Sequence, residues 1–362
     1  MNYYIGIDGG GTKTDGVLTS EKGRVLARAA GGASNPNDVT PEGALSVISG
    51  VIRLLLSEAG LSETVLPAVS IFVGVAGGIN HGPALKEGLD GEFPTARALG
   101  VSSDVQILLS GELPLGDGAC IICGTGSACF LRRGTELIRI GGWGYLLDSG
   151  GSGYDMGREA LEAVLRAHDG RGEPTRLTEL VTKRLGGEAH TRITEIYREG
   201  KPYIAACAPC VFEAAAEGDP VATAILRRNA RALAEYIEAA WRWLTADGTA
   251  ADVTAADGTA ADGTAADKTP PPTTLPVIMG GGISGTRADT WPALVASLTD
   301  PQIPLALSVA TARPVFGAAA EAKKQCDPTV TISDFADFRA AFVESYASIP
   351  VAKRPVAAPY SK

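Results

Sequence analysis

The sequence lacks any cluster of basic residues that could face a polyanion. Its 362 residues include 32 Lys and Arg against 41 Asp and Glu, which gives a net charge of −9. Nucleic acids and anionic membranes attract proteins mainly through concentrated Lys and Arg. We therefore expect neither nucleic acid nor a membrane surface as a partner.

Long apolar runs are also missing. No stretch of about 18 uncharged apolar residues, the length needed to cross a bilayer, occurs in the chain. The N-terminus enters a predicted strand without the charged and apolar segments of a secretory signal. With 45% hydrophobic and 20% charged residues, the composition is that of a soluble globular protein. We expect a cytoplasmic protein with room for two domains.

Cysteine is sparse, and its arrangement argues against a metal or redox site. The six cysteines include two CxxC spacings, Cys120/Cys123 and Cys207/Cys210, which can indicate zinc or a redox pair. The first pair lies in an apolar strand, where alternation would point the two thiols to opposite faces. The second lies in the apolar part of a helical run. We interpret both pairs as small buried hydrophobic residues.

What the chain does contain is a glycine-rich loop behind an apolar strand, in YYIGIDGGGTKT at 3–14. Asp8 ends the strand, and the glycines at 9–11 let the backbone approach an anion closely, while Thr12 and Lys13 add donors. Mg²⁺ takes one or two carboxylates together with phosphate oxygens, which suits Asp8. The alternative is a glycine-rich turn between strands. The loop does not fit GxxxxGK[ST], and it opens a strand where a dinucleotide-binding loop would open a helix.

The pattern of apolar segments predicts an α/β protein with an internal duplication. Residues 1–115 read as three consecutive strands followed by helix, strand, helix and strand, with a helix start at Thr40-Pro41. Residues 116–330 restart with an apolar strand, the turn at 124–127 and another strand. We expect an N-terminal domain at 1–115 and a C-terminal domain at 116–330. The helix in 331–362 carries aromatic residues on one face and should dock back on the N-terminal domain.

Residues 245–274 differ in kind from the rest of the chain. They form a near-perfect five-residue repeat of small and acidic residues, with Val253 as the one large apolar side chain. Such a segment cannot offset its own ordering entropy, so we predict a disordered surface insertion. A calcium-binding solenoid is the alternative, but the residues do not match GGxGxDxUx.

Four short apolar strands end in glycines or an acid: IGIDGGGT, VGVAGG, ICGTGS and VIMGGG. On a duplicated plan these resemble the fold shared by sugar kinases, actin and heat-shock chaperones, in which a nucleotide lies between two ribonuclease-H-like halves. More narrowly, the chain resembles the BadF/BadG ATPase family and, within it, the N-acetylglucosamine kinases. The matching motifs are IDGGGTKT, GASN at 32–35, VAGG at 75–78, SSD at 102–104, GTGS at 124–127, GGWGYLLDSGGSGYDMG at 141–157, MGGGIS at 279–284 and PVFGAA at 314–319.

The resemblance implies two actin-like ATPase domains with an interdomain cleft for ATP, Mg²⁺ and a sugar. It also implies a role for each of several residues. These roles are consistent with the chemistry of phosphoryl transfer, which depends mostly on positioning the reactants and neutralising their charge. ATP would be bound by Gly10, Gly11, Thr12, Lys13, Gly124, Thr125, Gly126, Gly281 and Gly282, with Asp8 on the metal side. The sugar would be bound by Asn35, Gly77, Gly78, Gly142, Trp143 and Asp148, with Asp104 as the catalytic base.

Several of these roles have alternatives. Asp104 could merely cap the following helix, and Trp143 could be ordinary core. If VQILL after Asp104 is a strand, the acid at the strand end becomes Glu112; we prefer Asp104, since VQILLSGEL also reads as a helix. N-acetylglucosamine kinases tend to carry Asp-Glu-Gly where this chain has Ser149-Gly150-Gly151, so Asp148 would substitute from one position earlier.

The function expected from this resemblance is an ATP-dependent kinase for an amino sugar, N-acetylglucosamine or glucosamine. A second class is the ATPase that activates an acyl-CoA dehydratase through an iron–sulfur cluster shared across a dimer, which needs exposed cysteines. A third is a sugar or nucleotide sensor that keeps the site but has lost the chemistry. The family resemblance is compatible with a homodimer.

Overall fold

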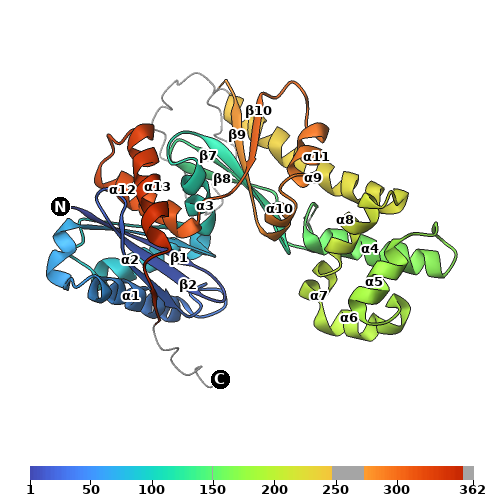
Figure 1. Cartoon of the computed structure of the whole chain (residues 1–362), viewed down its shortest axis with the longest axis horizontal. Coiled ribbons are helices and arrows are strands. Elements are labelled where there is room, and N and C mark those ends of the chain that lie inside the picture. The colour runs from blue at the N-terminus through green and yellow to red at the C-terminus, as the bar shows by residue number, and fades with distance from the viewer. Residues whose placement is uncertain (149, 247–272, 354–362) are drawn as a thin grey trace. The chain divides into compact units, whose positions relative to one another are not determined.

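A computed structural model describes residues 1–148, 150–246 and 273–353 and divides into two compact units (Figure 1). Of these residues, unit 1 contains 1–116 and 311–353, and unit 2 contains 117–246 and 273–310. The predicted disordered insertion at 245–274 lies outside the described residues except at its two ends. In the part of the chain that the structure describes, no helix is both long and apolar enough to cross a membrane.

Unit 1 is built on a six-stranded sheet in the order β11-β3-β2-β1-β4-β5. The first three strands are antiparallel neighbours, as the hairpin pattern predicts, and β4 and β5 then run parallel to β1. The strands are β1 (Tyr3–Gly9), β2 (Thr14–Ser20), β3 (Val25–Gly31), β4 (Val69–Val75), β5 (Ala98–Ser103) and β11 (Val351–Lys353).

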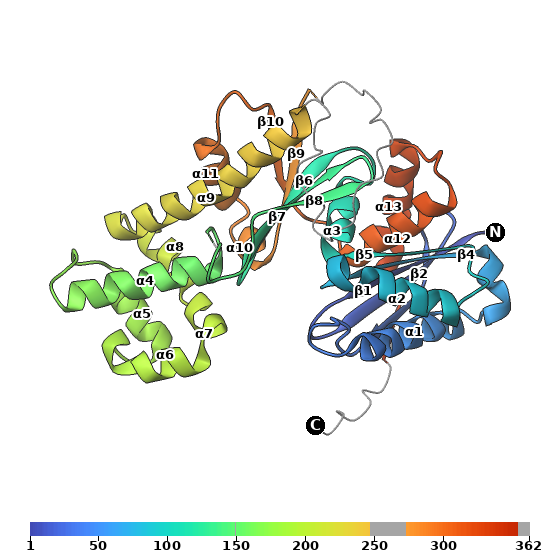
Figure 2. The same cartoon turned by 180° about the vertical axis from the view of Figure 1, so that it is seen from behind.

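Helices cover both faces of this sheet (Figure 2). α1 (Pro41–Glu58) and α2 (Gly78–Glu92) pack on the face that carries Ile5 and Ile7, and α1 begins at the Thr40 cap, whose hydroxyl accepts the Gly43 N–H. The opposite face carries Tyr4 and is covered by α3 (Asp104–Glu112), α12 (Pro314–Cys326) and α13 (Ile332–Tyr346). A short 3₁₀ helix, Glu63–Ala68, precedes β4.

The placement of α12 corrects the predicted domain boundary at residue 330. Residues 311–330 belong to unit 1, because α12 packs directly on β1 and α3 through glycines that allow backbone contact. A Cβ on Gly6 would lie 2.4 Å from the Ala319 nitrogen, and one on Gly317 would lie 1.7 Å from the Ile107 carbonyl oxygen. The chain therefore returns to unit 1 at Thr311, while the first crossing lies between Gly116 and Asp117.

The segment VQILLSGEL is a helix, so Glu112 ends α3 instead of a strand. Its carboxylate accepts hydrogen bonds from the backbone N–H groups of Thr311 and Ala312 and lies 3.1 Å from the Arg339 guanidinium of α13. Burial alone would raise the pKa of Glu112, but the two amide donors and Arg339 outweigh burial and lower it below its ordinary value. Glu112 therefore ties the returning segment to α3.

We expect Glu112→Gln to reduce the free energy of unfolding by about 1–2 kcal/mol at pH 7, because a neutral amide weakens charge-assisted hydrogen bonds. A carboxylate whose pKa is lower in the folded state stabilises the fold at pH values above its pKa in the unfolded state. The deficit should hold from pH 8 to 6, begin to shrink below the ordinary pKa of 4.5, and vanish below the lowered folded-state pKa. Denaturant unfolding across this range measures it, with exposed Glu87→Gln as control. A deficit that grows in acid would contradict the assignment.

Unit 2 repeats the sheet plan of unit 1. Its five strands lie in the order β10-β9-β6-β7-β8, which matches β5-β4-β1-β2-β3 position by position. Three antiparallel neighbours are again followed by two parallel strands. The strands are β6 (Gly118–Cys123), β7 (Ser127–Arg133), β8 (Glu136–Ile140), β9 (Leu275–Gly280) and β10 (Leu305–Val309). The internal duplication expected from the glycine-ended strands is present in the topology.

A helical region packs on one face of this second sheet and extends past its end. The long helix α9 (Pro220–Thr245) contacts β6, β7 and β8 and also packs on α4 and α8. The other elements are α4 (Gly153–His168), α5 (Leu177–Leu185), a 3₁₀ helix at Ala189–Arg192, α6 (Ile193–Glu199), α7 (Lys201–Ala205), α8 (Ala208–Ala216), α10 (Gly282–Thr286) and α11 (Trp291–Leu298).

The cysteines of the two CxxC spacings are buried, as interpreted from the sequence. Cys123 belongs to the core beneath α9, whereas Cys120 is buried outside that cluster, so the two thiols point to different faces of β6. Burial raises the pKa of the Cys123 thiol to about 12. These thiols are packing groups.

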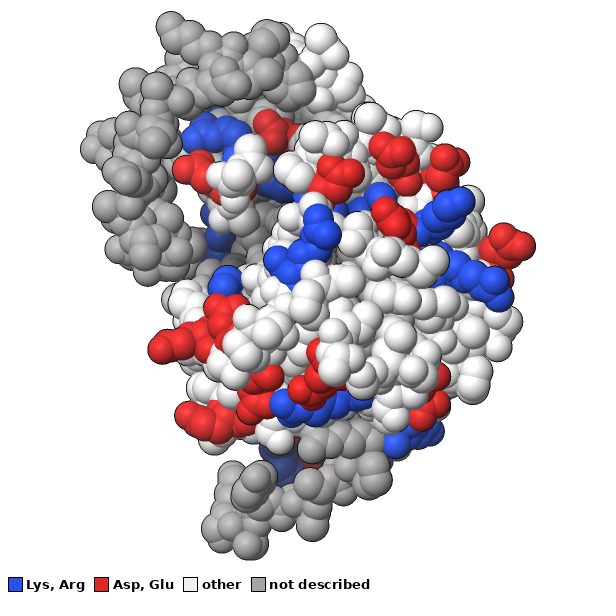
Figure 3. Space-filling model, turned by 90° about the vertical axis from the view of Figure 1, so that its left-hand side faces the viewer, with Lys and Arg blue, Asp and Glu red and all other residues white. Residues whose placement is uncertain are grey.

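On the face in Figure 3, Lys and Arg are interspersed with Asp and Glu.

Candidate active site

Three carboxylates lie where β1 and β5 of unit 1 end and β2 begins. Asp8 is paired in register with Asp15 of β2, and Asp104 follows β5 directly. Burial, together with the negative charges of Asp15 and Asp104, raises the pKa of Asp8 to about 6 against the opposing charge of Lys13. The Lys13 ammonium contacts the Asp15 carboxylate. This strand end therefore concentrates negative charge that a cation would relieve.

The donor set at Asp8 fits Mg²⁺ held mainly by phosphate oxygens and water. Within the described ranges, no group of three or more His, Cys, Asp or Glu is arranged as a metal cage. Mg²⁺ commonly binds through one or two carboxylates plus substrate phosphates, and it does not need such a cage. A single half-buried carboxylate with a raised pKa next to a glycine loop is consistent with that mode.

The glycine loop after Asp8 folds against the segment that carries Asn35. The Gly10 N–H donates to the Lys13 carbonyl at 2.9 Å, and the Gly10 carbonyl accepts the N–H groups of Ser34 and Asn35. A Cβ on Gly11 would lie 2.7 Å from the Asp38 carboxylate. Gly11, Thr12 and Lys13 are exposed, which leaves the turn accessible to a phosphate. The loop at 9–14 and the segment at 34–38 thus form one surface.

The Asn35 side chain lies in a polar cluster that includes two residues not expected from the sequence, Asn37 and His81. The Asn35 amide oxygen accepts the backbone and side-chain N–H groups of Asn37, and its NH₂ donates to Asp38 at 2.7 Å. The His81 ring contacts the Asn37 amide oxygen at 3.2 Å. Asn37 lies in a loop and His81 on α2, and no pattern in the sequence around either residue indicates that it lies beside Asn35.

The glycines at 77 and 78 are required by close contacts around this cluster. Gly77 has φ of 80°, and a Cβ there would lie 2.9 Å from the Asn35 amide oxygen. A Cβ on Gly78 would lie 2.3 Å from the Ser102 carbonyl oxygen, next to Asp104. The structure therefore brings Asn35, Gly77, Gly78 and Asp104 to the same end of the sheet.

Asp104 opens α3, but the cap of that helix is Ser103. The Ser103 hydroxyl accepts the Val105 N–H at 3.1 Å and donates to Asp104 Oδ1 at 3.0 Å. Oδ1 also accepts the Val105 N–H at 3.0 Å. Among the described residues Oδ2 has no hydrogen-bond donor, so this half-buried carboxylate is oriented through one oxygen and presents the other. A general base needs that geometry.

Unit 2 brings its two predicted nucleotide elements together. The turn at 124–126 is closed by the Gly124 N–H donating to the Gly126 carbonyl at 2.9 Å, with Thr125 exposed at its tip. Gly281 has φ of 93°, and a Cβ there would lie 2.4 Å from the Cys123 carbonyl oxygen. A Cβ on Gly124 would lie 3.8 Å from the Gly282 nitrogen. The glycines after β6 and β9 are thus neighbours.

The glycine-dense loop after β8 exposes Trp143 and engages Asp148. The Trp143 side chain is 59% exposed, which excludes the alternative that it is core, and the Arg139 guanidinium lies 4.6 Å from the ring centre. Asp148 Oδ2 accepts the Gly142 N–H at 2.7 Å, and Oδ1 accepts the Tyr236 hydroxyl at 3.0 Å. Both oxygens of the Asp148 carboxylate therefore accept hydrogen bonds from residues of unit 2. Ser149 lies outside the described residues.

The chain is similar to one family of ATPases and to kinases of amino sugars. The model of the BadF/BadG/BcrA/BcrD ATPase family matches residues 5–267. The chain is 35% identical over 238 residues to the N-acetylmuramic acid/N-acetylglucosamine kinase of Clostridium acetobutylicum, over 64% of this chain and 77% of that protein. It is 32% identical over 258 residues to the N-acetyl-D-glucosamine kinase of Dictyostelium discoideum, over 67% and 81%.

Solved structures agree with the fold. A Chromobacterium violaceum protein provisionally named an N-acetylglucosamine kinase superimposes with a TM-score of 0.59 at 25% identity, over 89% of this chain and 99% of that one. The predicted α/β fold, with two ribonuclease-H-like units of the actin-like ATPase type, is confirmed by this match and by the duplicated strand order.

Proposed function

Since the chain belongs to the BadF/BadG/BcrA/BcrD ATPase family, we propose that it transfers the γ-phosphate of ATP to a hydroxyl of an amino sugar, N-acetylglucosamine or glucosamine. One observation carries the proposal: a phosphate-type glycine loop, Asn35 and the half-presented carboxylate of Asp104 lie at one end of the unit 1 sheet. The relatives named as kinases of N-acetylglucosamine support the choice of acceptor.

In this proposal the residues of unit 1 perform positioning and proton transfer. The N–H groups of the loop at 10–12 bind phosphate oxygens, and Asn35 holds a sugar hydroxyl. Asp104 accepts the proton of the attacking hydroxyl, since its Oδ1 is fixed by Ser103 and Val105. Mg²⁺, held by phosphate oxygens on the side of Asp8, would neutralise the charge of the transferred phosphoryl group.

The proposal gives unit 2 the remaining contacts. The turn at 124–126 binds phosphate, and Gly281 and Gly282 pass beneath the adenosine. Glycines of the two elements lie in close backbone contact, so a nucleotide can lie against the main chain there without displacing side chains. Gly142 and Trp143 supply the sugar contacts of this unit.

Cysteine burial disfavours the second class of function, an activator with a bridging iron–sulfur cluster. Cys120, Cys123 and Cys129 are all 0% exposed and lie on adjacent strands β6 and β7. A cluster shared between two subunits needs thiols at the surface. The carbohydrate kinase is therefore the function that these residues support best.

A panel of acceptors tests the proposal. We expect ADP formation to depend on added sugar, with kcat/KM at least about 10-fold higher for N-acetylglucosamine or glucosamine than for glucose, because a site that hydrogen-bonds the 2-substituent penalises its loss. N-acetylmuramic acid belongs in the panel as a bulkier acceptor. ADP formation that is equal with and without sugar would indicate an ATPase, and no ADP formation with stabilisation by sugar would indicate a sensor.

A further inference from the structure

The loop at 141–152, which the structure describes except at residue 149, packs on one face of helix α9. Asn229, Leu233 and Tyr236 follow one another at intervals of four and three residues, which places them on the same side of a helix. Asn229 and Leu233 contact Gly151 at the end of the loop, and Tyr236 contacts Gly141 and Gly142 at its beginning. A Cβ on Gly151 would lie 2.4 Å from the Leu233 side chain.

Tyr236 holds the beginning of the loop. It is 8% exposed, and its hydroxyl donates to Asp148 Oδ1 at 3.0 Å and accepts the Gly142 N–H at 3.3 Å. Gly141 lies against the ring, since a Cβ there would be 2.2 Å from Tyr236 Cε1. Gly141 and Gly142 have φ of 68° and 69°, a conformation that other residues rarely adopt.

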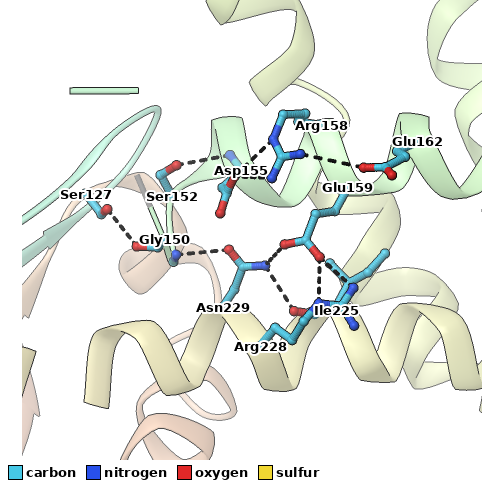
Figure 4. Close-up of polar contacts among 11 residues, drawn as sticks. Ser127, Gly150, Ser152, Asp155, Arg158, Glu159, Glu162, Ile225, Arg228 and Asn229 are labelled. Carbon is cyan, nitrogen blue, oxygen red and sulfur yellow. Dashed lines mark hydrogen bonds and ion pairs between the residues drawn. The ribbon is translucent and has the colours of Figure 1, made fainter. Parts of the chain in front are cut away.

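Asn229 holds the end of the loop (Figure 4). Its side chain is 2% exposed, and its amide oxygen accepts the Gly151 N–H at 2.9 Å. Its NH₂ donates to Glu159 at 2.7 Å and to the Ile225 carbonyl at 3.0 Å, so its orientation is fixed. The neighbouring Gly150 carbonyl accepts the Ser127 hydroxyl at 2.7 Å, which joins the loop to the turn at 124–127.

The hollow beside Asn229, about 440 Å³, contains charged side chains that are already paired with one another. Arg228 binds Glu159, and Arg158 binds Asp155 and lies 3.6 Å from Glu162. The Arg228–Glu159 pair joins α9 to α4, and the two pairs of Arg158 lie within α4. The hollow is therefore part of the support of the loop, and we assign it no ligand.

Between its two supports the loop exposes a tryptophan. Trp143 is 59% exposed, yet the backbone before it is fixed, because Arg139 donates to the carbonyls of Gly141 and Gly142 and lies over the indole. An amphipathic ring held rigidly at the surface offers a large contact area at low entropic cost. Such a ring is suited to stacking against the apolar face of a sugar.

We propose that Tyr236 and Asn229 are positioning residues for the acceptor sugar. They hold the loop at 141–152 on α9 so that Trp143 and Gly142 meet the sugar in one geometry, and they set sugar affinity without touching the transferred phosphoryl group. Asp148 acts with Tyr236 in this role. The inference rests on the proposed kinase function.

Tyr236→Phe removes the hydroxyl and keeps the ring beneath Gly141. We expect the KM for the sugar to rise about 10-fold, while kcat and the KM for ATP change less than about twofold, since one hydrogen bond to a charged partner is lost away from the phosphates. Steady-state kinetics with each substrate varied in turn measures this split. Tyr197→Phe, at a tyrosine that is 83% exposed on α6, is the matched control and should keep wild-type constants.

Asp148→Asn, which weakens the same contact from the other side, provides a second variant. Because both changes affect one hydrogen bond, the double variant should raise the sugar KM no more than the larger single change does. Any of three results would overturn the positioning role. The effects of the two single changes on the sugar KM could multiply in the double variant, or the Tyr236→Phe enzyme could keep the wild-type sugar KM. The third is an equal increase in the KM values for sugar and ATP together with a lower melting temperature. A wild-type protein that phosphorylates no sugar would overturn the proposed function and this inference with it.

Discussion

Asp104→Asn should lower the rate of sugar-dependent ADP formation by about 10³-fold, the contribution expected of a well-placed general base. The asparagine retains the shape of the side chain and can still accept the hydrogen bonds that Ser103 and Val105 donate to Oδ1. It cannot take the proton of the attacking hydroxyl. Sugar affinity, measured as the shift in melting temperature at increasing sugar concentration, should therefore stay within about threefold of wild type.

The control for this variant is Asp90→Asn, which changes an exposed acid of α2 that pairs with Lys86. It should leave both rate and affinity unchanged. Glu112→Gln should also retain activity, because Glu112 is bound to Thr311, Ala312 and Arg339 and is not presented at the strand end. A fully active Asp104→Asn enzyme would remove Asp104 from the role of base.

Gly317→Ala should strongly destabilise unit 1, although it adds only one methyl group. Its Cβ would lie 1.7 Å from the Ile107 carbonyl oxygen and 2.8 Å from the Gly111 nitrogen. Both are backbone atoms of α3, so no side chain can move aside, and α12 must separate from α3. We expect a loss of about 3 kcal/mol in the free energy of unfolding and a fall in melting temperature of roughly 6–10 °C.

Gly91→Ala in α2 is the matched control, since a Cβ there meets nothing within 4 Å. Alanine favours helix over glycine, so this change should be neutral or stabilising by about 0.5–1 kcal/mol. Calorimetry or denaturant unfolding compares the two variants. Equal stability for Gly317→Ala and Gly91→Ala would contradict the backbone contact between α12 and α3.

The local structure of both units could be predicted from sequence because short-range chemistry decides it. The apolar run before Asp8 forms a buried strand, Thr40-Pro41 begins α1, and the two CxxC spacings fall in buried segments. The helix beginning at Asp104 is the ambiguous element, since VQILL suits either a strand or a helix. Ser103 resolves the ambiguity by capping the helix directly.

Long-range contacts could not be predicted in the same way. The return of residues 311–330 to unit 1 depends on Gly6 and Gly317 lying at a backbone crossing, and no local pattern reveals which glycines meet. Asn229 and Tyr236 look like ordinary members of an amphipathic helix. The only signal is their seven-residue separation on its buried face, and nothing in the sequence connects that face to the loop at 141–152.

Transfer of phosphate to an amino sugar is tested by measuring both products of one reaction. The protein is incubated with ATP, Mg²⁺ and N-acetylglucosamine or glucosamine, and ADP and sugar phosphate are quantified by mass spectrometry. We expect one sugar phosphate for each ADP formed, and we expect Asp104→Asn to abolish both products together. ADP formed without sugar phosphate, or the absence of both products with either sugar, would show that the protein is not an amino-sugar kinase.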